Sequence, residues 1–266
     1  MFSVLIYIVI EIDYFRTLSF WRSIAAECIS TFLYMLMTSC MSMTVSTSPD
    51  MSPATAQVYC SLVAGLAITS ITTIFLPVSG AHANPTITLA SASIQRMSVV
   101  RAVAYITAQC GGGVAGASAM LVLYGASDYN IHNSSTVTVC VLECILSCMI
   151  VTVYLTVTDP CQEHACHHPS ISIGIGYMAC LAAYRGPLNP ACALAQAFLL
   201  NRWQNIWLLW AAPLLGGVCG AFCYQYVFSG SKDVRVVLEN IYGSENSEHY
   251  EDEDIGNDAY KNTNPG

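Results

Sequence analysis

Long apolar stretches, separated by short polar ones, occupy most of the 266-residue chain. The long stretches predict six membrane-crossing helices, at about 20–45, 56–78, 100–123, 136–157, 171–184 with its flanks, and 206–228. Two shorter apolar runs follow the second and the fifth of these. Each is only about ten residues long, too short for a hydrocarbon core of roughly 30 Å, and therefore predicts a half-helix that does not cross.

An Asn-Pro pair stands directly ahead of each short run, Asn84-Pro85 in SGAHANPTITLA and Asn189-Pro190 in GPLNPACALAQA. Proline suits the first position of a helix, and the asparagine before it can cap that helix. One Asn-Pro pair is also an ordinary turn, but two in corresponding places predict half-helices that enter from opposite faces. Their positive N-terminal ends and both asparagine amides would then face one pathway near the midplane.

Residues at matching places in the two halves of the chain indicate an internal repeat. The matching sets are Glu27-Cys28-Ile29 with Glu143-Cys144-Ile145, and Gly112-x-x-x-Gly116 with Gly216-x-x-x-Gly220. Small residues four apart allow helices to cross closely in lipid. The pattern predicts an inverted repeat of three plus three spans, the first at about 20–124 and the second at about 136–228.

Glu27 and Glu143 lie inside predicted spans, where a carboxylate is costly unless it has partners. We interpret both as structural. Each is expected to accept backbone N–H bonds from the loop ahead of an Asn-Pro pair, and His82 is expected to support the first of these loops. The alternative is a site for protons or cations, because acids inside a membrane are often functional.

Composition agrees with a polytopic membrane protein, since 55% of the residues are hydrophobic and only 10% are charged, against about 25% charged in a soluble domain. The net charge of −8 is concentrated in the segment 229–266. This segment is predicted to be a disordered acidic cytoplasmic tail that could bind a cytoplasmic partner. The rest of the chain is near neutral, so no nucleic-acid partner is indicated.

Lys and Arg are distributed unevenly between the two sides of the predicted spans. Only Arg185 and Arg202 fall on one side. The others fall on the opposite side: Arg16, Arg22, Arg96, Arg101, Lys232, Arg235 and Lys261. The positive-inside rule therefore places both termini in the cytoplasm. The segment 1–19 is predicted to be cytoplasmic or interfacial, because its apolar part is too short to span and is a poor signal peptide.

Most of the thirteen cysteines lie inside predicted spans, where they act as small apolar residues. The loop 159–170 holds a weak candidate for a zinc or copper site, made of Cys161, His164, Cys166, His167 and His168. Its spacing matches no established finger, so we interpret it as a polar loop and expect no metal and no cofactor. No nucleophile–base set or phosphate-binding loop is visible, which argues against an enzyme.

These motifs resemble the aquaporins, the major intrinsic protein family. The resemblance covers about 20–228 and rests on SGAH-x-NP, the second NPA, the duplicated glutamates and the small-residue crossings. FWRSIAAEC at 20–28, AYITAQCGGGVAGA at 104–117 and TDP at 158–160 are similar to the big brain branch. The resemblance implies an all-α hourglass of six transmembrane helices and two re-entrant half-helices. It also implies a plasma-membrane homotetramer with one pore per subunit.

Two departures from the family pattern fall on residues that the resemblance places in the pore. The pore motifs read Asn84-Pro85-Thr86 and Asn189-Pro190-Ala191, so a threonine replaces the usual alanine of the first motif. Three residues after Asn189 the family nearly always has an arginine, and here it is Cys192. The four positions of the outer selectivity filter, counted without gaps, are Ala64, Tyr177, Gly186 and Cys192. This set carries no fixed positive charge, although Arg185 lies close by.

Two functions remain open at this point. The first is a passive channel with non-standard selectivity that conducts water, small neutral solutes or monovalent cations. The second is a poorly conducting membrane protein that acts in cell-fate signalling or cell contact, through oligomer contacts and its acidic tail. The intact Asn-Pro pairs favour a pore, whereas the missing arginine favours altered selectivity or the second function.

Overall fold

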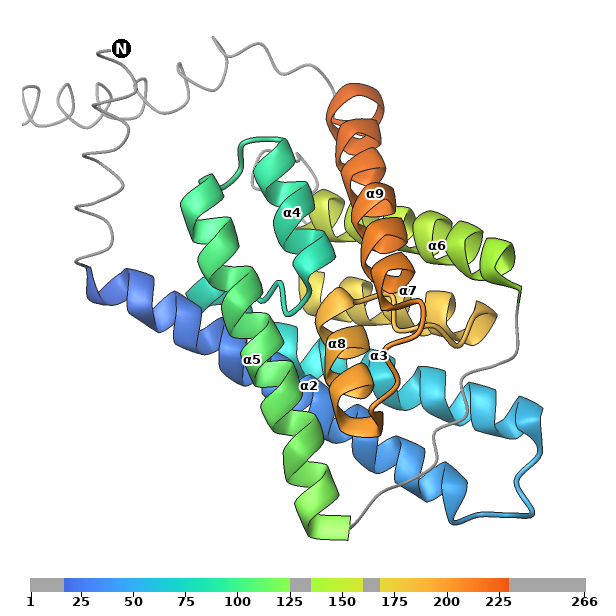
Figure 1. Ribbon diagram of the computed structural model, residues 1–266. Helices are drawn as coiled ribbons and strands as arrows, with labels where there is room; N and C mark the ends of the chain where they lie inside the picture. Colours follow the sequence, from blue (N-terminus) through green and yellow to red (C-terminus); the bar gives the residue numbers. More distant parts are fainter. Residues whose placement is uncertain (1–16, 125–134, 160–167, 230–266) are drawn as a thin grey trace, which may run out of the picture. The chain divides into compact units, whose positions relative to one another are not determined.

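The computed structural model describes residues 17–124, 135–159 and 168–229, and all regular structure within them is helical (Figure 1). The chain divides into the units Met1–Gln225 and Tyr226–Gly266, and the first holds every α-helix of the described residues. The elements are α2 Leu18–Ser46, α3 Pro53–Ser79, α4 Pro85–Ser93, α5 Val99–Tyr124, α6 Thr136–Val157, α7 Pro169–Ala183, α8 Pro190–Leu200 and α9 Ile206–Cys223, with a π-helix at Tyr224–Phe228.

Five helices are long and apolar enough to cross a membrane: α2, α3, α5, α6 and the segment Ile206–Phe228. The fifth predicted span, 171–184 with its flanks, corresponds to α7, Pro169–Ala183. Within the described residues α7 has 15 residues, or about 22 Å at 1.5 Å per residue, less than a bilayer core. The flank 160–167 lies outside the described residues, so the described part of this span is shorter than a full crossing.

The two half-helices begin as their sequences predict. Asn84 caps α4 and Asn189 caps α8; each asparagine side chain accepts an N–H two residues ahead, at 2.9 Å from Thr86 and 3.0 Å from Ala191. With nine and 11 residues, the helices are about 14 and 17 Å long, roughly half of a bilayer core. The caps therefore place both asparagines at the inner ends of short helices.

Helix pairing follows the internal repeat. α2 packs on α5 as α6 packs on α9, and each half-helix contacts a helix of the other repeat, α4 with α9 and α8 with α5 (Figure 1). Small residues allow these close crossings: a Cβ on Gly112 would overlap the carbonyl of Cys28, and one on Gly216 would overlap the carbonyl of Cys144. Equivalent glycines thus contact equivalent positions, directly after Glu27 and Glu143.

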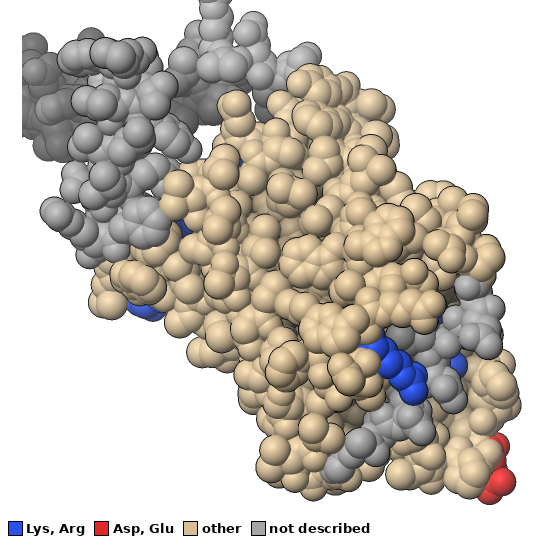
Figure 2. Space-filling model, in the orientation of Figure 1, with Lys and Arg blue, Asp and Glu red and all other residues tan. Residues whose placement is uncertain are grey.

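Large apolar side chains are exposed along the outer surfaces of the long helices, which fits contact with lipid. Examples are Leu66, Val103, Val122, Ile145 and Leu215. Figure 2 shows one face of the molecule on which charged side chains are sparse. The described part of the chain therefore has the surface of a multi-pass membrane protein.

Candidate functional site

The loop before the first Asn-Pro pair has an unusual backbone. Gly80, Ala81 and Ala83 all have positive φ angles, of 91°, 48° and 47°. Alanine adopts the left-handed region only when surrounding contacts hold it there. In this loop the contacts come from Glu27, to which the N–H groups of His82 and Ala83 both point.

Glu27 is fully buried and accepts four hydrogen bonds. His82 N donates to Oε1 at 3.0 Å and Ala83 N donates to Oε2 at 2.8 Å. Ser79 Oγ donates to Oε1 at 2.6 Å and Gln109 Nε2 donates to Oε2 at 2.7 Å. The carboxylate thus satisfies two backbone groups of a loop that has no helix or strand to pair with.

His82 belongs to the first loop and lines a cavity of about 460 Å³, which we call the His82 cavity. Its Nδ1 lies 3.0 Å from Thr88 Oγ1, and its ring meets the rings of Tyr105 and Tyr154 edge-on, with centroids 5.6 and 5.4 Å apart. Arg96 and Arg101 line the same cavity. His82 therefore holds the loop against helices α5 and α6 and also faces a polar space.

The second loop differs from the first in the contacts of its glutamate. Glu143 is fully buried, but neither of its carboxylate oxygens makes a hydrogen bond with the described residues. The amide of Leu188 and the side chain of Tyr184 are the groups that face it. One physical reason is visible in the sequence: Pro187, which matches His82, has no N–H to donate.

The two asparagines tie the loops together. Asn84 Nδ2 donates to Leu188 O at 3.0 Å, and Asn189 Nδ2 donates to Ala83 O at 2.8 Å. Each amide therefore bonds to the carbonyl that precedes the other Asn-Pro pair. Both side chains are fully buried, so the tips of the half-helices meet as the two Asn-Pro motifs predict.

Asn84 makes one further bond, which the sequence did not indicate. Its Nδ2 also donates to Tyr177 Oη at 3.0 Å. A primary amide has two N–H donors, so Leu188 O and Tyr177 Oη use both. Tyr177 is 1% exposed and its ring packs edge-on against Tyr34 at 6.4 Å. Ungapped counting placed Tyr177 at an outer filter, but its hydroxyl reaches the asparagine.

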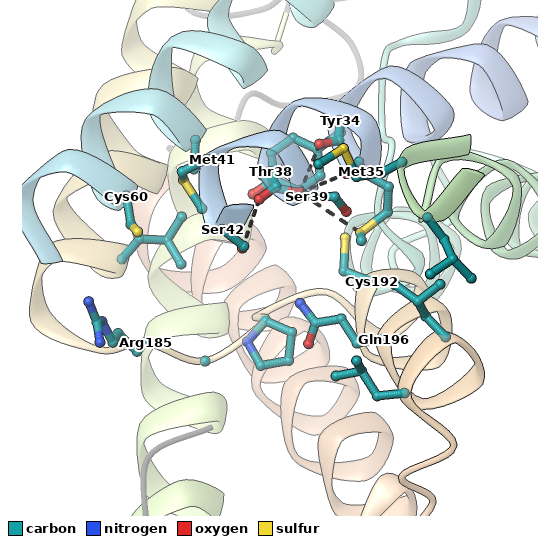
Figure 3. Close-up of a pocket in the computed structure, with 18 of the residues that line it drawn as sticks. Tyr34, Met35, Thr38, Ser39, Met41, Ser42, Cys60, Arg185, Cys192 and Gln196 are labelled. Atoms are coloured by element: carbon teal, nitrogen blue, oxygen red, sulfur yellow. Dashed lines mark hydrogen bonds between the residues drawn. The ribbon is translucent and has the colours of Figure 1, made fainter. Parts of the chain in front are cut away.

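The other three predicted filter residues, Ala64, Gly186 and Cys192, line one cavity of about 90 Å³, the Cys192 cavity (Figure 3). Cys192 is the third residue of α8 and is 3% exposed. Arg185 lines the same cavity, but Figure 3 shows its side chain beside Cys60 and away from Cys192. The place that the missing arginine would fill is therefore not taken by Arg185.

The Cys192 cavity and the His82 cavity are separate. Among the described residues none lines both cavities, and neither Asn84 nor Asn189 nor Tyr177 lines either of them. The side chains of Asn84, Asn189 and Tyr177 therefore line neither cavity.

Thr86, the unusual third residue of the first motif, is buried with its hydroxyl Oγ1 unpartnered among the described residues. Its Cγ2 fills the space where Gly217 lacks a side chain, because a Cβ there would overlap it. Thr88, two residues on, differs. Its hydroxyl accepts a bond from Gln109 at 2.9 Å and donates to Asn84 O at 3.2 Å.

Thr86→Val is therefore expected to stabilise the protein by about 1 kcal/mol, because it keeps the shape and removes a buried polar group without a partner. Thr88→Val is the matched control and is expected to destabilise it by about 1–3 kcal/mol, since it strands bonded groups. Thermal unfolding of the purified protein in detergent measures both. A lower melting temperature for Thr86→Val would show that its hydroxyl has a partner after all.

The metal candidates of loop 159–170 fall largely outside the described residues, namely Cys161, His164, Cys166 and His167. His168 is described and stands at the N-cap of α7 without a capping hydrogen bond. In the described part of the chain no three His, Cys, Asp or Glu side chains are placed to hold a metal ion.

Known proteins share this arrangement. The family model of the major intrinsic proteins matches residues 14–224. The chain belongs to the major intrinsic protein family. It is 36% identical over 250 residues to the neurogenic protein big brain of Drosophila melanogaster, an overlap of 90% of this chain and 35% of big brain. It is 26% identical over 238 residues to aquaporin-4 of Rattus norvegicus, covering 85% of this chain and 73% of that protein.

Solved structures agree with the sequence relatives. The aquaglyceroporin from Plasmodium falciparum superposes with a TM-score of 0.66 at 21% sequence identity, over 79% of this chain and 97% of the other. The predicted all-α, aquaporin-like hourglass fold is confirmed. Major intrinsic proteins are passive channels and not enzymes, and this chain is a multi-pass membrane protein of that family. It spans about a third of the length of big brain.

Proposed function

We propose that the protein is an aquaporin-type channel with non-standard selectivity, which conducts water, small neutral solutes or monovalent cations. The observation that carries the proposal is Cys192. It occupies the first turn of α8, within a cavity whose other predicted filter residues, Ala64 and Gly186, are small. The path runs from the Cys192 cavity, past Asn84 and Asn189, to the His82 cavity.

The chemistry of the path supports small permeants. A molecule passing in single file needs donors and acceptors in place of the water it leaves behind. The two asparagine amides and the loop carbonyls, such as that of Gly80, are of this kind. Cations are opposed by the N-termini of α4 and α8, each equivalent to roughly half a positive charge. A neutral thiol at position 192 adds nothing to that barrier, whereas an arginine would add a full charge in a poorly screened place.

The setting of the channel is part of the same proposal. We infer a homotetramer with one pore in each subunit, in the plasma membrane, with both termini in the cytoplasm. The uneven distribution of Lys and Arg supports this orientation. The acidic segment 229–266, which the structure does not describe beyond residue 229, would then face the cytoplasm, where it could bind a partner.

Cys192→Arg tests the selectivity. Any current carried by monovalent cations is expected to fall about tenfold or more, because the new charge stands at the first turn of α8 beside the cavity. Swelling and voltage-clamp currents in oocytes, corrected for the amount of protein at the surface, measure this.

Positively charged thiol reagents should change the flux of the natural protein and leave the flux of Cys192→Ser much less affected. Unchanged flux in both variants would place Cys192 outside the path.

A second function is favoured by the bond between Asn84 and Tyr177. With both amide hydrogens used, the structure offers no free donor at Asn84. A poorly conducting protein that acts in cell-fate signalling or cell contact would need no such donor, and the similarity to neurogenic protein big brain points the same way. Absence of flux in every Tyr177 variant that reaches the surface would favour this function.

A further inference from the structure

Glu27 and Glu143 occupy matching places in the two repeats, yet only Glu27 has hydrogen-bond partners among the described residues. Both side chains are fully buried. Glu27 accepts four bonds, from Ser79, His82, Ala83 and Gln109, whereas no described residue donates one to Glu143. Burying a carboxylate without partners is costly. The second repeat therefore keeps an acid whose expected ligands are missing.

Two of the missing donors belong to the loop. Counting back from each Asn-Pro pair places Pro187 opposite His82 and Tyr184 opposite Ser79. Proline has no N–H, so the first backbone donor is lost. The long side chain of Tyr184 faces the carboxylate but does not reproduce the short bond that Ser79 makes. Only the amide of Leu188 corresponds to a backbone donor of the first loop.

The third missing donor belongs to the helix that crosses behind the glutamate. Gly112 and Gly216 make the same close contact, with Cys28 and Cys144. Gln109 stands three residues before Gly112, and Pro213 stands three residues before Gly216, so the two correspond. Gln109 donates to Glu27 at 2.7 Å, and Pro213 has no polar side chain. Three of the four donors that hold the first carboxylate are thus replaced around the second, two of them by prolines.

The surroundings of Glu143 supply a second unpartnered oxygen and a neighbouring cavity. Ser147, one helical turn on and on the same face of α6, is fully buried, and its Oγ has no partner among the described residues. Gly186 lies against the carboxylate, because a Cβ there would overlap Glu143 Oε1. Gly186 also lines the Cys192 cavity. Gly186 and the ring of Tyr184, which a Cβ on Gly186 would also overlap, therefore lie next to the acid on the side of that cavity.

We propose that Glu143, with the hydroxyl of Ser147, binds a small monovalent cation that enters from the Cys192 cavity beside Gly186. The ion supplies the positive charge that the lost donors no longer supply. The site goes beyond the proposed function, because a bound ion can hold the second loop in place whether or not the pore conducts.

The oxygen ligands favour a monovalent ion. Calcium and magnesium are usually held by several carboxylates or by a full shell of oxygens and water. Glu143 is a single carboxylate, and no cluster of three acids, histidines or cysteines surrounds it in the described residues. One carboxylate neutralises a single charge, which matches sodium or potassium and leaves a divalent ion uncompensated.

Thermal unfolding of the purified full chain in detergent tests the site without any measurement of conduction. Sodium, potassium and choline chloride are compared at equal ionic strength. A small ion that binds only the folded protein raises its melting temperature, here by roughly 2–4 °C, whereas choline is too large to enter. Equal melting temperatures in all three salts would overturn the proposal, and would leave a protonated carboxyl or a buried water as the occupant.

Variants assign the effect to the residues. Glu143→Gln is expected to remove the difference between sodium and choline. Ser147→Ala is expected to reduce it, and serves if the first variant folds poorly. Glu27→Gln is the matched control at the same depth in the other repeat and should keep the full difference. A sodium effect that persists in Glu143→Gln and Ser147→Ala, or that is lost equally in Glu27→Gln, would refute this assignment. If the protein shows the sodium effect but conducts nothing, only the proposed channel function is refuted, and the proposed cation site stands.

Discussion

Tyr177→Ala is expected to increase flux through the protein about tenfold or more, which corresponds to roughly 1.4 kcal/mol in the free energy of opening. Two physical effects combine. The change frees one N–H of Asn84 for a permeant and removes a buried ring from between the Cys192 cavity and the half-helix tips. Because the rest of Asn84's bonding, to Leu188 O and Thr86 N, does not involve Tyr177, the two loops should remain joined.

Tyr177→Phe separates the two effects. It breaks only the hydrogen bond, which contributes about 1 kcal/mol, and leaves the ring. We therefore expect a smaller rise, up to about fivefold, than for the alanine variant. Swelling, solute uptake and voltage-clamp currents, scaled to surface protein, measure the series. Tyr124→Ala, at an exposed tyrosine near the end of α5, is the control and should match the natural protein.

The series also has a clear contrary outcome. If the alanine variant reaches the surface at the natural level and still passes no water, neutral solute, sodium or potassium, Tyr177 is not what closes the path. If flux rises as much in Tyr177→Phe as in Tyr177→Ala, the hydrogen bond to Asn84 holds the pathway shut and the ring is no obstacle.

Local signals were enough to predict the half-helices. An Asn-Pro pair specifies a cap and a first turn without help from the rest of the fold, and the short apolar runs limit the length. The structure places α4 and α8 where those signals lie. The end of α7 was predicted to within one residue, because Arg185, Gly186 and Pro187 follow it directly and end the apolar run.

The direction of a side chain is a different problem. Counting from Asn189 gives the height of Tyr177 along α7, but its direction depends on Tyr34 in α2 and Asn84 at the start of α4. These contacts are distant in sequence, so no local pattern predicts them. The bare carboxylate of Glu143 is the opposite case. Pro187 and Pro213 are plain in the sequence, and aligning the two repeats residue by residue could have shown that the second glutamate lacks donors.

That asymmetry leads to the second large effect, at Glu27. Glu27→Leu leaves the buried N–H groups of His82 and Ala83 without acceptors, at about 1–3 kcal/mol each, and also strands Ser79 and Gln109. A membrane protein that loses several kcal/mol should largely fail to reach the surface, since total stabilities are only about 5–15 kcal/mol. Glu27→Gln keeps an acceptor oxygen and should retain most of the folded protein.

The same pair of changes at Glu143 makes the comparison decisive. Glu143→Leu strands at most the amide of Leu188 and the hydroxyl of Tyr184, because Pro187 and Pro213 offer no donors. Its melting temperature should therefore fall less than that of Glu27→Leu. Surface biotinylation and thermal unfolding in detergent, measured in choline to exclude ion binding, compare the four variants. Equal losses for the two leucine variants would mean that both glutamates hold their loops alike. In that case Glu143 would accept hydrogen bonds from its loop in solution, as Glu27 does from the first loop.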